Sequence, residues 1–474
     1  MVDVYEAANQ PGGKLSSLEA DGYRFDRGPS LFTMPQYVDE LFALCGEDPR
    51  AHFRYTRQDP VCRYFWDDGA QLTAYADPDR FSEEAARVFG VDRAMIAQAL
   101  ARADAKYEVS GRTFLERPLH KAATWLRPAV AKTLTHLGSM DLTRTMHEVN
   151  AEAVGGHPHL TQLFDRFATY NGSDPYLAPG ILTVIPTFEH LRGTFLPEGG
   201  MVAITRALVG LAERQGVRFH LDTPVARVLS AGRRVTGLEL ASGRREAADL
   251  IVSNADVHGF YRALMPQAAP PRRVLGQERS TSALVFYWGI REQLPELGLH
   301  NIFFADDYRA EFAALRAGRI ADDHTVYVNA TARFVTGEAP PGQDNWFVMV
   351  NAPYDRGDQD WPAVERRVRG QVIARLSRVL GRDVGALIAT ERTWSPPGIA
   401  ADTGSHLGAL YGSSSNSRWA AFLRHRNQHR RYRNLFFVGG SVHPGGGVPL
   451  ALLSARIAGE LMPGKYPVVE APTA

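Results

Sequence analysis

The sequence has little cysteine and almost no excess of charge. Cys45 and Cys62 are its only cysteines among 474 residues, which excludes a disulfide framework and a zinc cluster built from thiolates. This scarcity favours a reducing, cytoplasmic environment. The chain carries 53 Lys and Arg against 52 Asp and Glu, a formal net charge of +1. Because such a balance creates no positive field, nucleic acid is not expected as a partner.

Long hydrophobic runs and several catalytic motifs are also lacking. No stretch of roughly 18 apolar residues occurs and no secretory signal pattern opens the chain, which predicts a protein that is soluble or lies on a membrane surface. His147-Glu148 is not followed by the second histidine of a zinc protease, and no Gly-x-Ser-x-Gly elbow or EF-hand loop is present. The sequence therefore predicts no metal site and no hydrolase.

The length of the chain and its hydrophobic pattern predict at least two lobes. A strand at Val2–Tyr5 precedes two glycine turns, and the RNLFFVGG segment is a buried strand that leads through a glycine-rich loop into a helix. Between Met201 and Ser253 the pattern predicts a helix, a strand, a hairpin and a further strand. Other predicted elements are strands at 281–290 and 345–351, and a helix that ends at Gly381.

A basic amphipathic stretch lies at residues 112–137. Its basic and apolar residues alternate in a way that is typical of helices in a membrane interface. The same pattern also fits a solvated helix face that packs on the core of the protein itself. Composition alone favours the second interpretation, and only the nature of the substrate would reverse that preference. The basic residues are Arg112, Arg117, Lys121, Arg127 and Lys132.

The most distinctive motif is VGGSVHPGGGVPLALLSA, which contains five glycines within residues 439–447. A tight turn between a strand and a helix needs fewer glycines than this, which favours a ligand-binding loop. Glycines let backbone N–H groups approach a ligand, and the N-terminus of the following helix favours negative charge in the same place. No Lys-Ser or Lys-Thr follows, so this is not a Walker phosphate loop. His443 within the motif is either an acid–base group or a loop histidine with satisfied hydrogen bonds.

Two turns near the start of the sequence carry weaker signals of the same kind. Glu6 ends the first strand, where an acid in a dinucleotide-binding unit takes the ribose hydroxyls. Gly12-Gly13-Lys14 adds open backbone amides and a cation that suits phosphate. The segment YRFDRGPSLF adds another glycine turn. The order of these features along the chain is more specific than any one of them.

The sequence resembles the flavin-dependent phytoene desaturases and related carotenoid dehydrogenases, a group of flavin amine-oxidoreductase-like proteins. The resemblance spans nearly the whole chain. It rests on VYEAANQPGGKL, GYRFDRGPSLF, PYLAPGILTVIPTFEH, GTFLPEGGM and ADLIVSNAD, and above all on FFVGGSVHPGGGVPLALLSA. FDRFATYNGSDPY, ALVFYWGI and LGLHNIFFADDY are most similar to the desaturases that act on 1-hydroxycarotenoids at the 3,4 position.

The resemblance implies FAD and an α/β fold. It implies a Rossmann-like FAD-binding domain assembled from discontinuous segments, together with an α+β substrate domain that contains a mixed sheet. The FAD-binding domain would comprise residues 1–80, 196–275 and 416–474. The substrate domain would comprise residues 81–195, which include the membrane-docking lobe, and residues 276–415.

The resemblance also implies which residues hold the adenosine and phosphate end of FAD. Glu6 would bind the adenosine ribose, and the backbone of Val225 would meet the adenine. Gly12, Gly13 and Lys14 would lie along the pyrophosphate and the ribityl chain. The family begins with a further strand and a G-x-G-x-x-G loop, which this sequence does not contain. We therefore expect a truncated chain, and activity does not follow for it from the resemblance alone.

At the flavin end, the resemblance implies two groups of residues. Those of the second glycine turn would border the flavin, and those of the C-terminal motif would face the ribityl chain and the isoalloxazine. A helix N-terminus in that position stabilises the negative charge of reduced flavin. The residues are Gly28, Pro29 and Ser30 in the turn, and Gly440, Gly447 and Val448 in the motif.

The implied reaction is FAD-dependent desaturation of a carotenoid in carotenoid biosynthesis. Two hydrogens would leave across a carbon–carbon bond beside the polyene, one as a hydride and one as a proton. Glu189 is the first candidate for the proton acceptor, although a salt-bridged role at the surface fits it equally well. Asp174, Arg166 and His443 are the other catalytic candidates. The sequence does not indicate the final electron acceptor.

A polyene substrate is insoluble in water and resides in the bilayer, which makes residues 112–137 a predicted docking surface of a cytoplasmic protein peripheral on the membrane. Two other functions remain open. One is a non-catalytic isoprenoid-binding or escort protein on the same fold. The other is a different flavin oxidoreductase, such as an amine-oxidising enzyme, although neither an aromatic cage nor a cysteine for covalent flavin linkage is visible.

Overall fold

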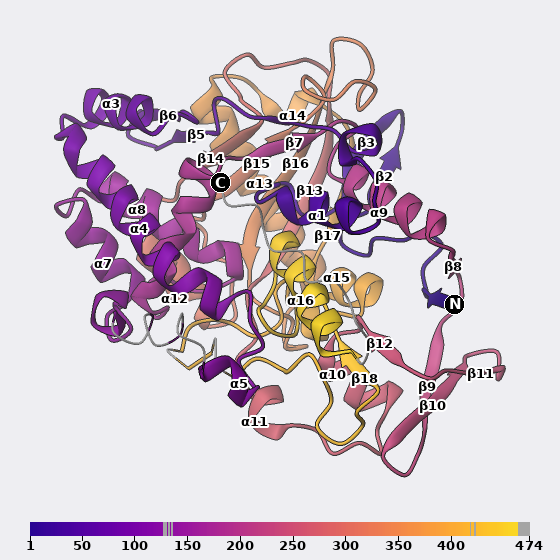
Figure 1. Cartoon of the computed structure of the whole chain (residues 1–474). Coiled ribbons are helices and arrows are strands. Elements are labelled where there is room, and N and C mark those ends of the chain that lie inside the picture. The colour runs from indigo at the N-terminus through magenta and orange to yellow at the C-terminus, as the bar shows by residue number, and fades with distance from the viewer. Residues whose placement is uncertain (127–129, 131–132, 134–135, 418, 421–422, 463–474) are drawn as a thin grey trace.

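A mixed sheet of seven strands forms the centre of the molecule (Figure 1). The computed structural model describes residues 1–462, except 127–129, 131–132, 134–135, 418 and 421–422. The strand order is β17-β13-β16-β15-β14-β5-β6, and all neighbours are antiparallel except β14 and β5. These strands are β5 Cys62–Phe65, β6 Gln71–Ala74, β13 Ser282–Ile290, β14 His300–Phe303, β15 Val326–Ala330, β16 Asp344–Ala352 and β17 Ile388–Trp394.

Smaller sheets surround the large one. Two are parallel pairs, β1 with β8 and β12 with β18; β9, β10 and β11 form an antiparallel meander, and β2–β3 and β4–β7 are antiparallel pairs. Their bounds are β1 Val2–Tyr5, β2 Ser17–Ala20, β3 Tyr23–Asp26, β4 Tyr55–Arg57, β7 Phe195–Pro197, β8 Val217–His220, β9 Val225–Ala231, β10 Arg234–Leu240, β11 Arg245–Ala247, β12 Ile251–Ser253 and β18 Leu435–Phe437.

The helices gather mainly in a lobe on one side of the sheet and in a layer on the other (Figure 1). They are α1 Gln36–Leu44, α2 Pro49–His52, α3 Pro78–Phe89, α4 Arg93–Phe114, α5 Ala122–Trp125, α7 Met146–Ala153, α8 Pro158–Asp165, α9 Val202–Arg214, α10 Val257–Gly259, α11 Arg272–Leu275, α12 Tyr308–Arg316, α13 Trp361–Leu380, α14 Val384–Leu387, α15 Pro396–Thr403 and α16 Val448–Leu461. Short 3₁₀ or π turns are η1 Leu137–Met140, η2 Arg166–Asn171, η3 Gly180–Val184, η4 Thr187–Leu191, η5 Phe260–Leu264 and η6 His406–Gly408.

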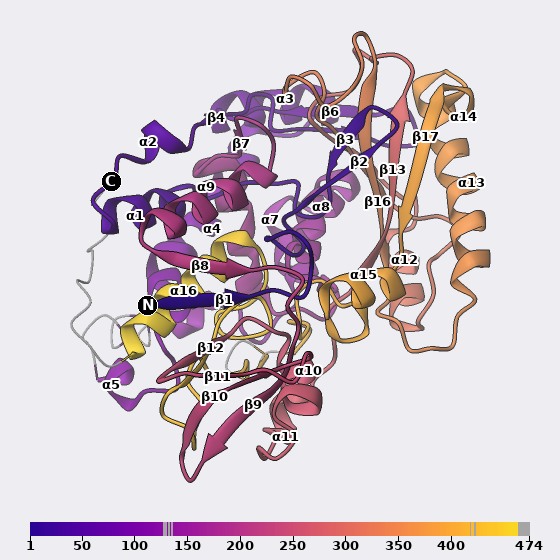
Figure 2. The same ribbon diagram turned by 90° about the vertical axis from the view of Figure 1, so that its right-hand side faces the viewer.

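Helix α13 covers one face of the large sheet (Figure 2). Asp360 caps its N-terminus by accepting a hydrogen bond from the Ala363 backbone N–H at 3.2 Å, and Gly381 ends it with a left-handed φ of 64°. The helix predicted to end at Gly381 is therefore confirmed. Its apolar residues recur every four positions and face the aliphatic side of the sheet. This core contains Val368, Val372 and Leu376 from the helix and Leu284, Phe286, Trp288, Val326, Val328, Trp346, Val348 and Val350 from the strands.

The opposite face of the sheet carries several polar and aromatic side chains. Side chains alternate between the faces of a strand, and Ile302 is in register with both Tyr64 and Tyr327. His300 lies two residues from Ile302, so these four side chains share one face. The helical lobe of α3, α4, α7 and α8 packs on this face, and its apolar residues form one buried cluster with Tyr64 and Ile302. The candidate site lies in this layer.

The two parallel pairs join segments that are far apart in the sequence. Val2 of β1 lies opposite Val217 of β8, and Ile251 of β12 lies opposite Leu435 of β18. Parallel neighbours require long crossover connections, which the intervening segments supply. The predicted α/β class is confirmed: parallel strands come from separate parts of the chain, and a second, mixed sheet stands beside them.

The division into two domains stays a prediction. β5 and β6 fall within residues 1–80, the first predicted segment of the FAD-binding domain, yet they pair at one edge of the seven-stranded sheet. β1, in the same segment, pairs with β8 instead. The first segment therefore contributes strands to both parts of the fold.

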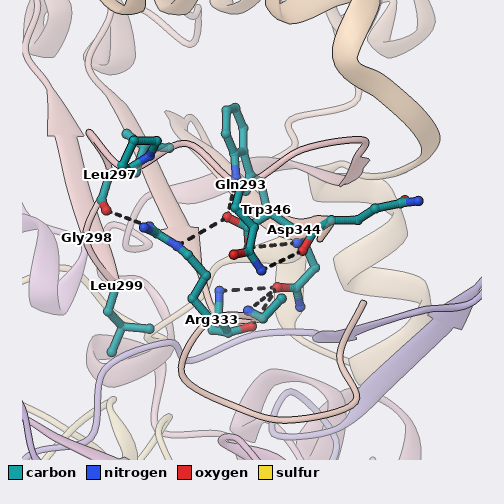
Figure 3. Close-up of polar contacts among 12 residues, drawn as sticks. Gln293, Leu297, Gly298, Leu299, Arg333, Asp344 and Trp346 are labelled. Atoms are coloured by element: carbon teal, nitrogen blue, oxygen red, sulfur yellow. Dashed lines mark hydrogen bonds and ion pairs between the residues drawn. The ribbon is translucent and has the colours of Figure 1, made fainter. Parts of the chain in front are cut away.

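A buried carboxylate, Asp344, anchors loops at the start of β16 (Figure 3). Arg333 donates a hydrogen bond from Nη2 to the Leu297 carbonyl oxygen at 2.5 Å, and its Nε lies 3.7 Å from Asp344 Oδ2. Asp344 also accepts a hydrogen bond from Trp346 Nε1 at 3.3 Å. Burial raises the pKa of Asp344 to about 6, because Arg333 and the hydrogen bonds offset only part of the cost of burying a carboxylate.

Within the described residues, no helix combines the length and the apolar character that a membrane span requires. The basic stretch predicted at 112–137 contains the end of α4, all of α5 and the start of η1. Residues 127–129, 131–132 and 134–135 of this stretch, which include Arg127 and Lys132, lie outside the described part of the chain.

Candidate functional site

The two glycine turns near the start of the chain pack directly against each other. A Cβ on Gly28 would lie 2.2 Å from the carbonyl oxygen of Lys14, so only glycine fits there. Gly12 has a φ of 110°, and a Cβ on it would lie 2.4 Å from the Leu15 carbonyl oxygen. A Cβ on Gly13 would meet no atom within 4 Å, which leaves that side of the turn open. The residues of both turns that the resemblance assigns to FAD therefore lie next to each other in the fold.

Glu6 lies beside the segment that leads into β9. Its carbonyl oxygen accepts a hydrogen bond from the Thr223 N–H at 2.8 Å, and the Ala8 carbonyl oxygen accepts one from the Asp222 N–H at 3.0 Å. The Glu6 carboxylate accepts a hydrogen bond from the Ala8 N–H at 2.9 Å. Val225 begins β9 two residues after Thr223. Glu6 and Val225, both assigned to the adenosine by resemblance, therefore occupy one neighbourhood.

The glycine-rich loop before α16 is closely packed on one side and open at the helix. A Cβ on Gly446 would lie 2.7 Å from the Tyr411 Cβ, and a Cβ on Gly440 would lie 3.3 Å from the Gly446 Cα. Gly447 has a φ of 103°, and a Cβ on it would meet no atom within 4 Å. The open side of the loop is therefore at the N-terminus of α16, next to Val448.

Three buried cations surround the 410–415 segment, which also contacts the glycine-rich loop through Tyr411. Lys14 Nζ donates a hydrogen bond to the Leu410 carbonyl oxygen at 3.1 Å. Arg424 Nη2 donates one to Ser415 Oγ at 3.1 Å, and Arg279 Nη1 lies 3.5 Å from Ser413 Oγ. The turn at Lys14 and the glycine-rich loop thus both contact residues 410–415.

Few carboxylates neutralise these cations. Asp256 Oδ2 lies 3.7 Å from Arg279 Nη2, and no carboxylate of the described residues pairs with Lys14 or Arg424. Burial lowers the pKa of Lys14 to about 8 and that of Arg424 to about 10, and it also lowers the pKa of Arg279. Arg279 Nε, Arg279 Nη2 and Arg424 Nη1 have no hydrogen-bond partner in the described part of the molecule. This arrangement suits an anionic ligand such as a pyrophosphate.

Arg166 and Glu189 form a buried ion pair in front of the polar face of the sheet. Arg166 Nη2 lies 2.6 Å from Glu189 Oε1, and the two side chains are 7% and 2% exposed. Arg166 Nη2 also donates to the Tyr64 hydroxyl oxygen at 2.5 Å, and the Tyr170 hydroxyl donates to Glu189 Oε2. The pair joins η2 and η4 to β5. Two of the four catalytic candidates are therefore in direct contact.

Burial and charge act in opposite directions on this ion pair. Burial by itself would raise the pKa of Glu189, but Arg166, with help from His190 and the Tyr170 hydroxyl, lowers it below its usual value. Burial likewise opposes the charge of Arg166, yet Glu189 raises the pKa of that guanidinium. Both groups are charged at neutral pH, and Glu189 is a weak base. Glu189 thus forms a salt bridge, as one interpretation of the sequence predicted, but this salt bridge is buried and not at the surface.

The other two catalytic candidates lie apart from this pair. Asp174 pairs with Arg316 and accepts a hydrogen bond from the Tyr176 N–H at 2.8 Å, so it stabilises a turn. His443 Nε2 lies 2.7 Å from the Arg117 carbonyl oxygen and donates its proton there. Burial lowers the pKa of His443 to about 4, which keeps its ring neutral. No hydrogen bond between described residues links Asp174 or His443 to Glu189.

Ser30 connects the second glycine turn to the polar face of the sheet. Its Oγ lies 2.8 Å from the Tyr327 hydroxyl oxygen, which also lies 2.7 Å from His300 Nδ1. The sequence alone did not indicate Tyr327 or His300, nor did it indicate Arg279 or Arg424. Each is a single residue inside a strand or loop, and no spacing pattern relates it to the glycine motifs.

A cavity of about 430 Å³ lies in the helical lobe between α4, α7 and η3. Phe164 and Pro186, which line it, are two and three residues away from Arg166 and Glu189 in the sequence. The cavity thus reaches segments that carry the ion pair. Its lining is mixed: the other apolar residues include Ala99, Ala103, Val109, Met140, Val149 and Ala153, and the charged ones are Arg102, Lys106, Asp141, Arg144 and Glu152.

Known proteins resemble this chain over nearly its whole length. A family model described as flavin-containing amine oxidoreductase matches residues 1–462. The 1-hydroxycarotenoid 3,4-desaturase of Flavobacterium sp. (strain P99-3) is 42% identical over 463 residues, which cover 98% of this chain and 94% of that protein. The hydroxyneurosporene desaturase of Cereibacter sphaeroides is 33% identical, with coverage of 97% and 92%.

Solved structures share the fold. A putrescine oxidase variant superposes on this chain with a TM-score of 0.63, and the match covers 97% of this chain and 92% of the other. The identity is 12%, so this likeness concerns the arrangement of helices and strands alone. It agrees with an α/β fold in which parallel strands and a larger mixed sheet lie side by side.

Replacing Arg166 by Met is expected to lower the free energy of unfolding at pH 7 by roughly 3–5 kcal/mol, because the Glu189 carboxylate would be left buried without its partner. In the wild type the folded-state pKa of Glu189 is lowered, so the contribution of the pair is complete above the unfolded pKa and is lost as the pH falls through the folded value. In the variant, burial alone raises this pKa. The deficit should therefore shrink between pH 7 and about pH 5. Urea denaturation followed by tryptophan fluorescence at several pH values measures both effects.

The matched control is Arg367→Ala, which breaks an ion pair with Asp322 whose side chains are 39% and 85% exposed. Its effect should stay below about 1 kcal/mol at every pH. An Arg166→Met protein as stable as the wild type at pH 7 would contradict the role of the buried pair.

Proposed function

The chain belongs to the family of flavin-containing amine oxidoreductases, and from this membership we propose that it is an FAD-dependent desaturase that introduces a double bond into a carotenoid. The observation that carries the proposal is the 42% identity, over 98% of the chain, to a 1-hydroxycarotenoid 3,4-desaturase. The proposed substrate is accordingly a 1-hydroxycarotenoid, and the proposed reacting bond joins C3 and C4. The reaction is a step in carotenoid biosynthesis.

The residues around the glycine turns fit FAD. A pyrophosphate would supply a counter-charge to Lys14 and Arg424, and it would accept hydrogen bonds from the unpartnered nitrogens of Arg279 and Arg424. Glu6 and Val225 would hold the adenosine, as the resemblance implies. When bound, FAD supplies the two-electron acceptor to which the substrate loses a hydride.

The flavin itself would lie between the second glycine turn and the start of α16. Gly28, Pro29 and Ser30 would border it on one side, and Gly440 and the Gly447–Val448 helix start on the other. The open space beside Gly447 supports this arrangement. The N-terminus of α16 would stabilise the negative charge that the flavin gains on reduction.

Glu189 is the proposed acceptor of the proton. Loss of a hydride leaves a cation delocalised over the polyene, and a hydrogen on the neighbouring carbon is then acidic, so a weak base suffices. Glu189 is such a base, because Arg166 lowers its pKa. Its charge also stabilises positive charge on the polyene, and Arg166 and Tyr170 hold its carboxylate in one orientation.

The proposed route for the polyene leads through the cavity between α4, α7 and η3. The apolar residues of its lining suit a hydrocarbon chain, and Phe164 and Pro186 bring it close in sequence to the ion pair. Exclusion of water along this route would strengthen the electrostatic interaction between Glu189 and the substrate.

We further propose that part of the 112–137 stretch contacts a membrane surface. Leu126 is 85% exposed and Trp125 is 38% exposed, at the end of α5. Lys121 Nζ donates a hydrogen bond to Gln428 Oε1 at 3.1 Å, which ties this region to the C-terminal part of the chain. Trp419, also exposed, lies nine residues before Gln428 in the sequence. Exposed tryptophan and leucine beside basic residues suit a lipid interface, where a carotenoid resides.

Lys14→Met and Arg424→Met are each expected to weaken FAD binding by about tenfold or more, because each removes a charge-assisted contact to an anion. The flavin-free protein should keep or gain thermal stability, since each substitution removes a buried cation that lacks a carboxylate partner. Flavin fluorescence titration and thermal unfolding of the flavin-free protein measure the two effects separately. Lys106→Met is the control, because Lys106 pairs with Asp141 in the helical lobe and its loss should leave FAD affinity unchanged. Unchanged affinity in both test variants would contradict the proposed cofactor site.

In cells that accumulate 1-hydroxycarotenoids, the protein should produce a carotenoid with two hydrogens fewer and absorption at longer wavelength. Glu189→Gln should lower the turnover per bound flavin by roughly 10²-fold or more, because it removes the proton acceptor. The substitution also leaves Arg166 buried without its charged partner, so thermal unfolding is measured alongside turnover to show that the variant is folded. Liquid chromatography with mass detection follows the products. A flavin-loaded protein that forms no new double bond in any carotenoid, or that oxidises an amine instead, would refute the proposed reaction.

The double variant Trp125→Ser/Leu126→Ser should reduce flotation of the protein with vesicles of mixed anionic and neutral phospholipids by several-fold, since it removes apolar area from the lipid interface. Phe334→Ser is the matched control, because Phe334 is 46% exposed but belongs to a different surface loop. Equal flotation of the double variant and the wild type would argue against membrane contact by this segment.

A further inference from the structure

His300 is buried among polar side chains, yet one of its ring nitrogens is unpaired. The residue is 3% exposed and lies in β14, on the sheet face that the helical lobe covers. Its Nδ1 lies 2.7 Å from the Tyr327 hydroxyl oxygen and 3.3 Å from Asn329 Nδ2. Its Nε2 has no hydrogen-bond partner among the residues that the structure describes.

The neighbours of Nδ1 determine where the single proton of the ring lies. Asn329 Nδ2 also donates to the Leu299 carbonyl oxygen at 2.8 Å, so it is the amide nitrogen and acts only as a donor. We therefore assign His300 Nδ1 as the acceptor of hydrogen bonds from Asn329 Nδ2 and from the Tyr327 hydroxyl. Burial lowers the pKa of His300 to about 4, which keeps the ring neutral near pH 7. The proton is consequently on Nε2, which is a buried donor without an acceptor.

The position of His300 relates this donor to the proposed reaction. Ser30 and His300 both bind the hydroxyl of Tyr327, so only one hydroxyl separates the flavin-bordering turn from the imidazole. On the other side, Ile302, two residues from His300 on the same face of β14, is in register with Tyr64, which binds Arg166. His300 therefore shares one face of the sheet with the tyrosine that contacts the ion pair.

We propose that the Nε2–H of His300 donates a hydrogen bond to the hydroxyl oxygen of a 1-hydroxycarotenoid and so selects substrates that carry this end group. The inference rests on the proposed desaturase function and assigns its specificity to one side chain. In such a substrate the hydroxyl-bearing carbon is two bonds from C3. A donor that holds the hydroxyl near Ser30 therefore also aligns the C3–C4 bond with the flavin.

Other polar groups on this face have their partners within the protein. The Tyr64 hydroxyl accepts a hydrogen bond from Arg166 and donates one to Glu189 Oε1 at 3.4 Å, and the Tyr170 hydroxyl donates to Glu189 Oε2, so neither hydroxyl offers an uncommitted donor. A hydrocarbon without the hydroxyl would leave Nε2–H without an acceptor, as it is in the free protein, and would gain nothing from this donor. Discrimination by His300 thus follows from the hydrogen bond that only the hydroxylated substrate accepts.

The test compares kcat/KM of the flavin-loaded protein for a 1-hydroxycarotenoid and for the same polyene without the hydroxyl. The wild type should prefer the hydroxylated substrate by roughly 10–100-fold, the effect of one buried hydrogen bond. His300→Phe should bring this ratio close to one by lowering kcat/KM for the hydroxylated substrate alone. His300→Gln, whose amide N–H₂ is a donor, should retain part of the preference.

His190→Phe is the matched control. His190 is as deeply buried as His300, and neither of its ring nitrogens has a hydrogen-bond partner in the described structure, but its ring stacks on Phe81 at 4.5 Å. Its Nε2 lies 3.7 Å from Glu189 Oε1, so the substitution can change the rate for both substrates. Since phenylalanine preserves stacking and His190 is not the proposed partner of the hydroxyl, the ratio of the two kcat/KM values should match that of the wild type. Thermal unfolding of each variant shows whether its fold is retained.

Equilibrium binding of the two carotenoids, measured by quenching of tryptophan fluorescence, provides a readout that does not depend on turnover. His300→Phe and His300→Gln should show the same order of discrimination in binding as in kcat/KM. Equal conversion of both polyenes by the wild type, or an unchanged preference in the two His300 variants, would overturn the role of His300 and leave the desaturase function intact. Conversion of neither polyene by the flavin-loaded wild type would overturn both.

Discussion

The buried ion pair between Arg166 and Glu189 is the interaction on which the interior of this protein depends. Two charges in a low-dielectric interior are tolerated only when each is paired and its remaining donors or acceptors are hydrogen-bonded. Tyr64 and Tyr170 meet that requirement, and they do so from a strand and from a helical turn. The pair consequently fixes the helical lobe at a defined position on the sheet. The same requirement gives the interior an ordered, buried carboxylate.

Much of the fold could be predicted from the sequence because its signals are local. The first strand, the hairpin of β9 and β10, the helix ended by Gly381 and the final strand–loop–helix unit all follow from short periodic patterns and glycines, and all are confirmed. The candidate site was predictable only where motifs mark it. Arg279, Arg424, Tyr327 and His300 carry no such mark, since each acquires its role only from contacts that the folded chain creates, such as that of Tyr327 with Ser30, 297 residues away. Burial in particular, which makes Arg424 a cation without a counter-charge, is a property of the assembled fold.

Two parts of the interior follow one physical rule. Around the 410–415 segment, cations outnumber their carboxylate partners, and on the polar face of the sheet a single imidazole N–H lacks an acceptor. In both places a buried polar group gains more from a ligand than an exposed group would, because it does not give up water contacts when the ligand arrives. The first place favours charge and the second favours a hydroxyl. Under the proposed function, the first place would hold the pyrophosphate of FAD and the second would bind the hydroxyl of the substrate.

The hydrogen bond from Lys14 to the Leu410 carbonyl oxygen spans 396 positions of the chain. At synthesis rates of roughly 5–20 residues per second, the segment around Lys14 waits on the order of 20–80 s on the ribosome before its partner has been made. The glycine turns, the buried arginines and the loop before α16 can therefore assemble only in the last phase of translation or after release. Until then, β12 lacks its parallel partner β18, and the apolar residues packed around β12 lack Tyr432, Leu435 and Phe437.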